Sequence, residues 1–187
     1  MTVRTSIEVG VDELQRALAD DAGFEAWYRR SVPRVYSYLM SRGGGDAALA
    51  EDLTQQTFVA AIDQRSRFDG RSDTITWLCG IARHKLADHF RAIEQDERRQ
   101  RRMEVRQIQL DENRQSQLGI EDRTMIGEAL RSLPASQRAV LAFVVLDDLP
   151  VAEAARLMGR SRSATESLLF RARDSFRRAY AAEDRDD

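Results

Sequence analysis

The sequence predicts an all-α protein of two small helical domains joined by a flexible linker. Alanine, leucine, arginine, glutamate and glutamine dominate the composition, and alternation of β-branched with polar residues is almost absent. These residue types favour helices over strands. The 187 residues suffice for one large or two small domains. Because a charged stretch divides the apolar residues into two groups, we expect two.

Composition and patterning exclude several classes of protein. No apolar run approaches the roughly 18 residues that a membrane span needs, so we expect no membrane insertion. The N-terminus lacks the pattern of a secretory signal and Cys79 is the single cysteine, which predicts a cytoplasmic protein without disulfides. No phosphate loop, paired metal carboxylates or nucleophile–base set is present, so we expect no enzyme, metal or cofactor. His84 and His89 lie five residues apart, which does not suit a helical metal pair.

Glycine and proline positions divide the first half of the chain into four predicted helices. Gly43, Gly44 and Gly45 interrupt the apolar pattern, and Gly70 marks a turn. Pro33 either kinks the second helix or lies in its first turn. The helices are predicted over residues 10–19, from Phe24 onward, over residues 47–64 and from residue 74 to about 91.

The second half begins after a stretch in which opposite charges alternate densely. This stretch holds few large apolar residues, which predicts a linker that is partly helical and partly disordered. Apolar periodicity then resumes, and Pro134 and Pro150 each mark the start of a helix. Residues 139–146 are almost continuously apolar and should form the most buried helix. The predicted divisions are an N-terminal extension at 1–22, domains at 23–93 and 124–182, the linker at 94–123 and an acidic tail at 183–187.

The most informative motif is a helix-turn-helix over residues 150–178. A short helix ends at Gly159 and a longer one begins near Ser163, a spacing that lets the second helix enter the major groove of DNA. Residues 151–180 contain seven arginines and three acids, an excess that suits phosphate contacts. A helical hairpin with a solvated arginine face would share this pattern. The second helix has a packed side (Thr165, Leu169, Ala172 and Phe176) and an outward side (Ser163, Glu166, Ser167, Phe170, Arg171 and Asp174).

The second half of the chain resembles domain 4 of sigma-70-type factors, especially the extracytoplasmic-function class. The resemblance is carried by residues 129–134, 137–141, 149–158 and 167–173. It implies that the last helix reads the −35 promoter element. Glu166 and Leu168 stand where the family commonly has basic residues, and Glu166 either accepts from cytosine N4 or repels phosphate. The candidate −35 contacts are Arg160, Arg162, Ser163, Glu166, Ser167, Phe170, Arg171 and Arg173.

Residues 51–58 are similar to the helix of sigma domain 2 that binds the polymerase clamp. Spacings of three, four and seven residues place four side chains on one stripe of this helix. The resemblance implies that its partner is the coiled coil of the β′ clamp, whereas the pattern alone also fits a solvated helix face. The family usually carries Glu where Gln56 stands. The candidate residues are Asp52, Gln55, Gln56 and Val59 on the stripe, together with Leu53.

Residues 68–83 resemble the loop and helix that handle the −10 element in sigma domain 2. Arginines suit phosphate, and an aromatic ring can stack on an unpaired base. Phe68 is more readily explained as a core residue, and so is Trp77. Gly80 replaces a bulky or basic residue of the family. The candidate −10 contacts are Arg65, Arg67, Phe68, Asp69, Arg71, Trp77, Arg83, His84, Lys85, Asp88 and Arg91.

Together the two resemblances imply a sigma factor that directs promoter-specific transcription by recognising the −35 and −10 elements and stabilising the melted non-template strand. The implied partners are core RNA polymerase, through its β′ clamp and β flap, promoter DNA and an anti-sigma factor. Two other functions stay open at this point. One is a helix-turn-helix regulator that binds closed duplex alone. The other is a sigma-like interaction protein that does not read promoters.

Overall fold

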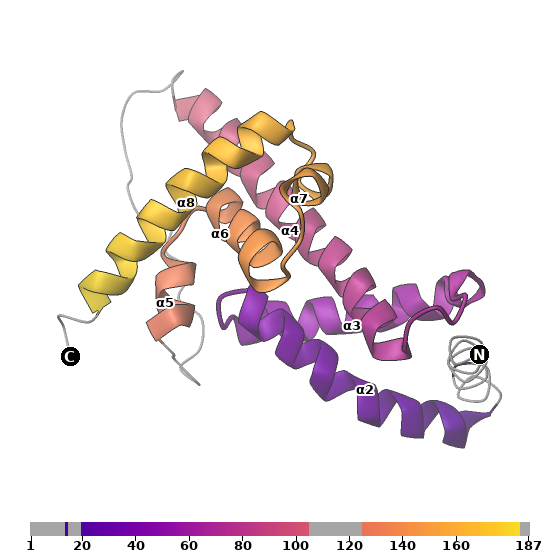
Figure 1. Cartoon of the computed structure of the whole chain (residues 1–187). Helices are drawn as coiled ribbons and strands as arrows, with labels where there is room; N and C mark the ends of the chain where they lie inside the picture. Colours follow the sequence, from indigo (N-terminus) through magenta and orange to yellow (C-terminus); the bar gives the residue numbers. More distant parts are fainter. Residues whose placement is uncertain (1–13, 15–19, 105–124, 184–187) are drawn as a thin grey trace. The chain divides into compact units, whose positions relative to one another are not determined.

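The computed structural model describes Leu14 and residues 20–104 and 125–183. All regular structure in these residues is helical, which confirms the all-α prediction. The described residues form two compact units, one with residues 20–40 and 49–85, the other with residues 41–48, 86–104 and 125–183. In chain order (Figure 1), the elements are α2 (Asp21–Arg42), α3 (Ala47–Asp63), the 3₁₀ turn η1 (Arg65–Arg67), α4 (Thr74–Glu104), α5 (Met125–Arg131), α6 (Ala135–Leu141), the π-helical segment η2 (Ala142–Leu146), α7 (Val151–Leu157) and α8 (Arg162–Glu183).

In the first unit, α2 buries one stripe of side chains at every fourth position. The stripe consists of Trp27, Ser31, Val35 and Leu39, and a four-residue spacing keeps all four on one face of a helix. Pro33 lies inside the helix and is exposed, so it does not occupy the first turn.

An aromatic cluster joins α2 to α3. The Trp27 ring meets the edge of Phe58 at 5.4 Å between centroids, and Tyr28 meets Phe58 at 4.7 Å. Such edge-to-face pairs add to the apolar burial. The buried hydroxyls of Thr54 and Thr57 donate to backbone carbonyls one turn earlier, at 2.6 and 2.7 Å. Their polar groups are therefore satisfied within α3, and the face they occupy can be buried.

Helix α4 begins where Asp73 caps it. The Asp73 carboxylate accepts the amide of Thr76 at 2.9 Å and its hydroxyl at 2.6 Å. The amide at this position has no partner within the helix, so the side chain supplies one. These hydrogen bonds hold the pKa of Asp73 below its ordinary value, and the hydroxyl of Thr76 is the largest cause.

The end of α4 differs from the prediction. The helix continues to Glu104, through the first part of the predicted linker, instead of ending near residue 91. Ion pairs one turn apart, Glu94 with Arg98 at 3.0 Å and Asp96 with Arg99 at 3.7 Å, explain how so polar a stretch stays helical. The remainder of the predicted linker, residues 105–123, lies outside the described residues.

In the second unit, α8 packs on α5, α6 and α7 (Figure 1). The apolar stretch 139–146 is buried only as far as Phe143. Beyond it the helix widens into η2, and Val145 and Leu146 are 50% and 40% exposed. The segment expected to be the most buried helix is therefore exposed in its last turn, because a π-helical turn rotates the following side chains out of the buried stripe.

The remaining predicted segments fall largely outside the description. Of the predicted helix over residues 10–19, only Leu14 is described, and it is helical and buried. Nearly all of the acidic tail lies beyond the described residues. Among the described helices, none combines the length and apolar character needed to cross a membrane.

The Asp73 cap leads to a pH-dependent prediction. We expect Asp73→Ala to lower the free energy of unfolding of the first unit by about 1 kcal/mol at pH 7, the usual cost of a lost cap. Because the folded-state pKa of Asp73 lies below the ordinary 3.8, the wild-type contribution is present above that pH and is lost as the pH falls through the folded value. Asn at position 73 also caps the helix but does not titrate. Urea unfolding should therefore show the free energy of unfolding of wild type falling relative to that of Asp73→Asn below about pH 4. A constant difference between the two across pH 7 to 3 would contradict this role.

Two glycines should respond in opposite ways to substitution by alanine. Gly159 has a φ of +63°, where a side chain is strained, so Gly159→Ala should destabilise the second unit by about 1–2 kcal/mol. Gly80 lies within α4 with no atom within 4 Å of an added Cβ, so Gly80→Ala should stabilise the first unit by about 1 kcal/mol. Thermal unfolding should show a lower unfolding temperature for Gly159→Ala and a higher one for Gly80→Ala. Shifts in the same direction would refute the explanation from backbone geometry.

Candidate nucleic-acid interface

A tight turn joins α7 to α8. The amide of Gly159 donates to the carbonyl of Arg156 at 3.2 Å, and the amide of Arg160 donates to that of Ala155 at 2.9 Å. This pair of bonds, with glycine in the left-handed conformation, is the Schellman arrangement that ends a helix. Gly159 therefore ends α7, as the sequence predicts.

Helix α8 begins directly after this turn because Ser161 caps it. The amide of Ala164 donates to the Ser161 hydroxyl at 3.2 Å, and the amide of Thr165 donates to the Ser161 carbonyl at 3.0 Å. Two capped helices separated by four residues, Met158 to Ser161, confirm the helix-turn-helix.

The two faces of α8 follow the predicted division. Thr165, Leu169 and Ala172 are buried, and Phe176 is half-buried. All six residues predicted to face outward are exposed, and Phe170 is 74% exposed. The structure also buries Leu168, at 3% exposure, so the hydrophobic residue at this position serves packing.

The arginines near the turn differ in their surroundings. Arg162, Arg171 and Arg173 are exposed. Arg162 pairs with Glu166 at 2.9 Å, so the acid on the outward face is partly neutralised by its own helix. Arg160 is only 18% exposed and pairs with Glu94 of α4. Sequence reasoning missed Glu94, because 66 residues separate it from its partner and no local spacing connects the two.

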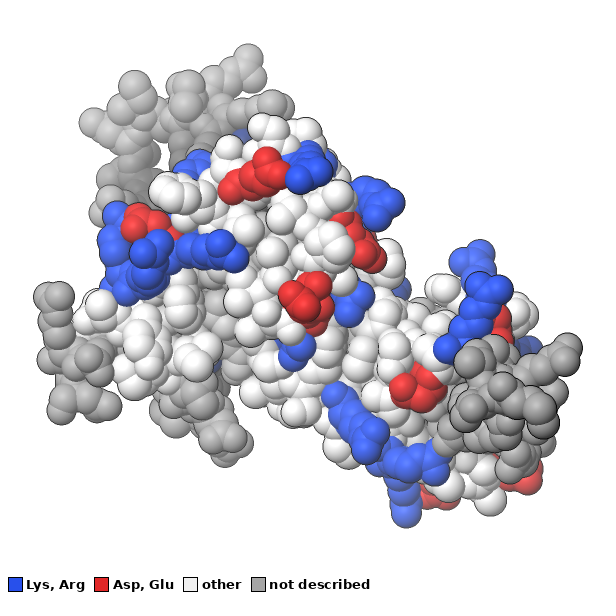
Figure 2. Space-filling view, viewed as in Figure 1, with Lys and Arg blue, Asp and Glu red and all other residues white. Residues whose placement is uncertain are grey.

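Acidic groups are interspersed among the basic ones on the face of the molecule that Figure 2 shows. Several pairs lie within one helix, including Arg178 with Asp174 at 2.9 Å and Arg29 with Glu25 at 2.6 Å. Opposite charges so close together reduce the long-range field that attracts DNA.

The predicted stripe on α3 is exposed as a group. Asp52, Gln55, Gln56 and Val59 all face solvent, and the Gln56 amide donates to the Asp52 carboxylate at 2.9 Å. Val59 is 60% exposed, which leaves an apolar side chain beside polar ones. Leu53 is 2% exposed and belongs to the core.

The loop before α4 presents charged side chains over a packed aromatic pair. Phe68 is 8% exposed and its ring lies 5.0 Å from that of Trp77, which is half-buried. Gly70 has a φ of +71°. The Asp69 carboxylate accepts the amide of Arg71 at 3.1 Å and closes the turn. Arg65, Arg67, Asp69 and Arg71 are exposed.

Along α4, the remaining candidate −10 residues are partly or fully exposed. His84, Asp88 and Arg91 are exposed, and Arg91 pairs with Asp88. Arg83 and Lys85 are half-buried, and Arg83 Nε donates to the Tyr38 hydroxyl at 3.4 Å. Within the described part of the chain, no three His, Cys, Asp or Glu residues are grouped so as to hold a metal ion.

Comparisons with known proteins agree with this arrangement. Residues 27–95 match the family model described as sigma-70 region 2, and residues 123–175 match sigma-70, region 4. The chain is 32% identical over 177 residues to the ECF RNA polymerase sigma factor SigC of Mycobacterium tuberculosis, covering 94% of each protein. It is 33% identical over 169 residues to the ECF RNA polymerase sigma factor BldN of Streptomyces coelicolor, covering 85% of this chain and 61% of that one.

A solved structure supports the fold. The sigma factor RpoE from Bartonella quintana, in complex with the anti-sigma factor NepR, superposes with a TM-score of 0.50 at 21% identity, over 83% of this chain and 95% of that one. The two family models match in the same order as the two predicted domains. The match to SigC covers nearly the full length of both proteins. The chain belongs to the sigma-70 family of RNA polymerase sigma factors, in the extracytoplasmic-function class.

Proposed function

We propose that this sigma factor docks on the β′ clamp of core polymerase through α3, contacts the −10 element through residues 65–91, and contacts the −35 element through the turn before α8 and the outward face of α8. The observation that carries the proposal is that the core holds one face of α3 and one of α8 outward, and both bear the predicted residues. We also propose that the chain contacts the β flap of polymerase and binds an anti-sigma factor. It acts in the cytoplasm and catalyses no reaction.

The α3 stripe suits a protein partner with hydrogen-bond donors. Asp52 offers a carboxylate, and Gln56 is already oriented by its bond to that carboxylate. The exposed Val59 adds apolar area at one end of the stripe. A buried charged hydrogen bond is worth more than an exposed one, so Asp52 should dominate this interface once water is excluded.

The outward face of α8 suits the major groove. Phe170 can contact the methyl group of thymine, and Arg171 and Arg173 can reach phosphates. The pairing of Arg162 with Glu166 lowers the repulsion that the acid would otherwise exert on DNA. If the pair separates at the groove, Glu166 can accept from cytosine N4.

The −10 interface must compensate for the opening of the duplex. Unstacking costs about 1.4 kcal/mol per base-pair step, and an aromatic platform returns roughly 1–3 kcal/mol per base. Because Phe68 is buried, we propose that it supports Trp77 from behind and that Trp77 supplies the surface for a base. The exposed arginines of the loop then hold the phosphates of the same strand.

A single charge reversal on α3 tests the docking surface. Asp52→Arg should abolish promoter-specific run-off transcription by core polymerase, because it replaces the acceptor with a like charge for the partner's donors. The template is a promoter found by sequencing the 5′ ends of transcripts made from host genomic DNA by the same holoenzyme. Glu25→Arg, which makes the same charge change at an exposed site on α2, should leave transcription unchanged.

The outcomes separate the remaining functions. Transcription that survives Asp52→Arg would overturn the proposed docking surface. Binding of core polymerase by wild type without any specific transcript would favour a sigma-like protein that does not read promoters.

Two substitutions on α8 distinguish base reading from phosphate contact. In the holoenzyme, Phe170→Ala should weaken binding to the cognate −35 sequence about 10-fold and weaken binding to sequences lacking the contacted thymine little. Arg171→Ala should weaken binding to all sequences and reduce the slope of log affinity against log salt by about 1. Arg177→Ala, an exposed arginine two turns further along, serves as the control. Equal losses on all sequences for Phe170→Ala would rule out its role in base reading.

A further inference from the structure

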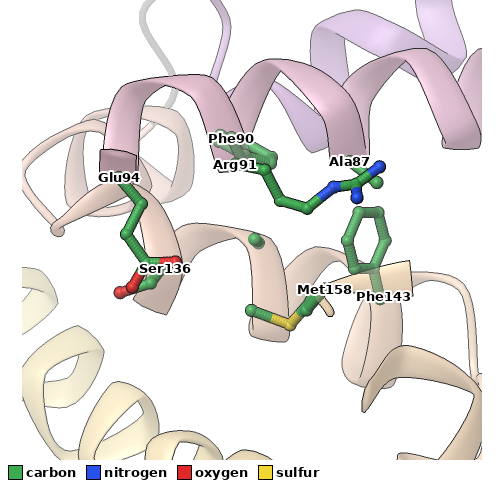
Figure 3. Close-up of a pocket in the computed structure, with 8 residues that line it drawn as sticks. Ala87, Phe90, Arg91, Glu94, Ser136, Phe143 and Met158 are labelled. Carbon is green, nitrogen blue, oxygen red and sulfur yellow. The ribbon is translucent and has the colours of Figure 1, made fainter. Parts of the chain in front are cut away.

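The hollow that Figure 3 shows in the second unit is too small for a ligand. Phe90, Phe143 and Met158 are among the side chains that line it, and its volume of about 10 Å³ leaves room for at most one water molecule. Open space beside a candidate DNA-binding face lies instead in the first unit, at Gly80 of α4.

Nothing in the described part of the chain requires a glycine at position 80. Proteins need glycine where φ is positive or where another group approaches the backbone closely. Gly159 meets the first condition, with a φ of +63°, whereas Gly80 lies inside α4. Apart from its chain neighbours and the backbone of its own helix, no described atom lies within 4 Å of a Cβ added at Gly80. Because glycine is less favourable than alanine inside a helix, Gly80 weakens α4 without any packing in return.

Gly80 lies on the outward face of α4, between two side chains that suit an unpaired base. Trp77 stands one turn before it and His84 one turn after it, and these spacings keep all three residues on one face of the helix. Trp77 is half-buried and His84 is exposed. Neither side chain comes within 4 Å of the added Cβ. The two rings therefore leave a gap over the helix backbone at Gly80.

The groups around this gap are held in place by other parts of the first unit. The ring of Phe68 lies 5.0 Å from that of Trp77 and is itself buried, so it supports the indole from the core side. Arg83, one turn after Gly80, donates from Nε to the Tyr38 hydroxyl at 3.4 Å. This bond keeps a permanent positive charge near the gap. An aromatic surface and a cation are thus in position before any DNA binds, which lowers the entropic cost of binding.

We propose that the gap at Gly80 receives one unpaired base of the −10 non-template strand. The base lies against the Trp77 ring and close to the α4 backbone, and Arg83 contacts the adjoining phosphate. Any side chain at position 80 would take up the space of the base, so glycine gives access at the expense of helix stability. This inference rests on the proposed role of residues 65–91 at the −10 element, and it adds the residue that sets how closely the base approaches.

The test separates bulk at position 80 from helix stability. Gly80→Ala and Gly80→Leu both raise helix propensity, so both should raise the unfolding temperature of the full chain. We nevertheless expect the holoenzyme to bind a fork-junction promoter with a single-stranded −10 element more weakly, by about 5-fold with Gly80→Ala and about 30-fold with Gly80→Leu. The control Ala26→Leu adds bulk at an exposed site on α2 and should change this affinity by less than about 2-fold.

Removing single bases from the −10 non-template strand identifies what occupies the gap. At one position, an abasic site should weaken binding by the wild-type holoenzyme about 10-fold and abolish the difference between wild type and Gly80→Leu. At the other positions that difference should remain.

The outcomes distinguish this inference from the proposed function. Equal affinities of wild type, Gly80→Ala and Gly80→Leu would overturn the inference alone. A difference between wild type and Gly80→Leu that persists at every abasic position would also overturn it, because the gap would then receive sugar and phosphate and not a base. A wild-type holoenzyme that does not distinguish the −10 sequence from an unrelated single strand would contradict the proposed function, and this inference with it.

Discussion

In α3 and α8, a buried stripe of side chains determines which residues face outward and can meet a partner. In α8, burial of Leu169 and Ala172 turns Phe170 and Arg171 outward. In α3, burial of Leu53 turns its neighbours on the polar stripe outward in the same way. A fully buried leucine contributes about 1.5–3 kcal/mol, so rotating either helix would expose several such groups at once. The proposed binding faces are therefore held by the core.

Much of this arrangement can be read from the sequence, because it depends on local spacing. The period of apolar residues identified the packed side of α8, and Gly159 and Pro150 stand at the ends of α7 as their backbone preferences require. The same reasoning favoured Phe68 as a core residue, and the structure buries it. These features need only the geometry of one helix or one turn.

Other features could not be predicted because they depend on contacts between distant residues or on competition between weak effects. Dense charge around Glu94 suggested a linker, yet ion pairs one turn apart let α4 continue to Glu104. The widening at η2 exposes Val145 and Leu146 although their sequence is as apolar as the buried residues before them. The pairing of Glu94 with Arg160 exists only because the fold brings α4 to the turn.

Interspersed opposite charges reduce general attraction to nucleic acid, and the contacts that we propose to the −35 and −10 elements lie on different helices. Linking two weak binding surfaces raises the effective concentration of each once polymerase holds both. On this proposal, specificity appears mainly in the complete transcription complex.

Permanganate reactivity of thymines in the −10 element tests the central claim most directly, because it reports strand opening at the promoter. With core polymerase and this chain together, we expect thymines of the non-template strand to become reactive at the −10 element, and with either component alone we expect none. If the combination binds the promoter and those thymines stay unreactive, the assignment of residues 65–91 to promoter opening is contradicted.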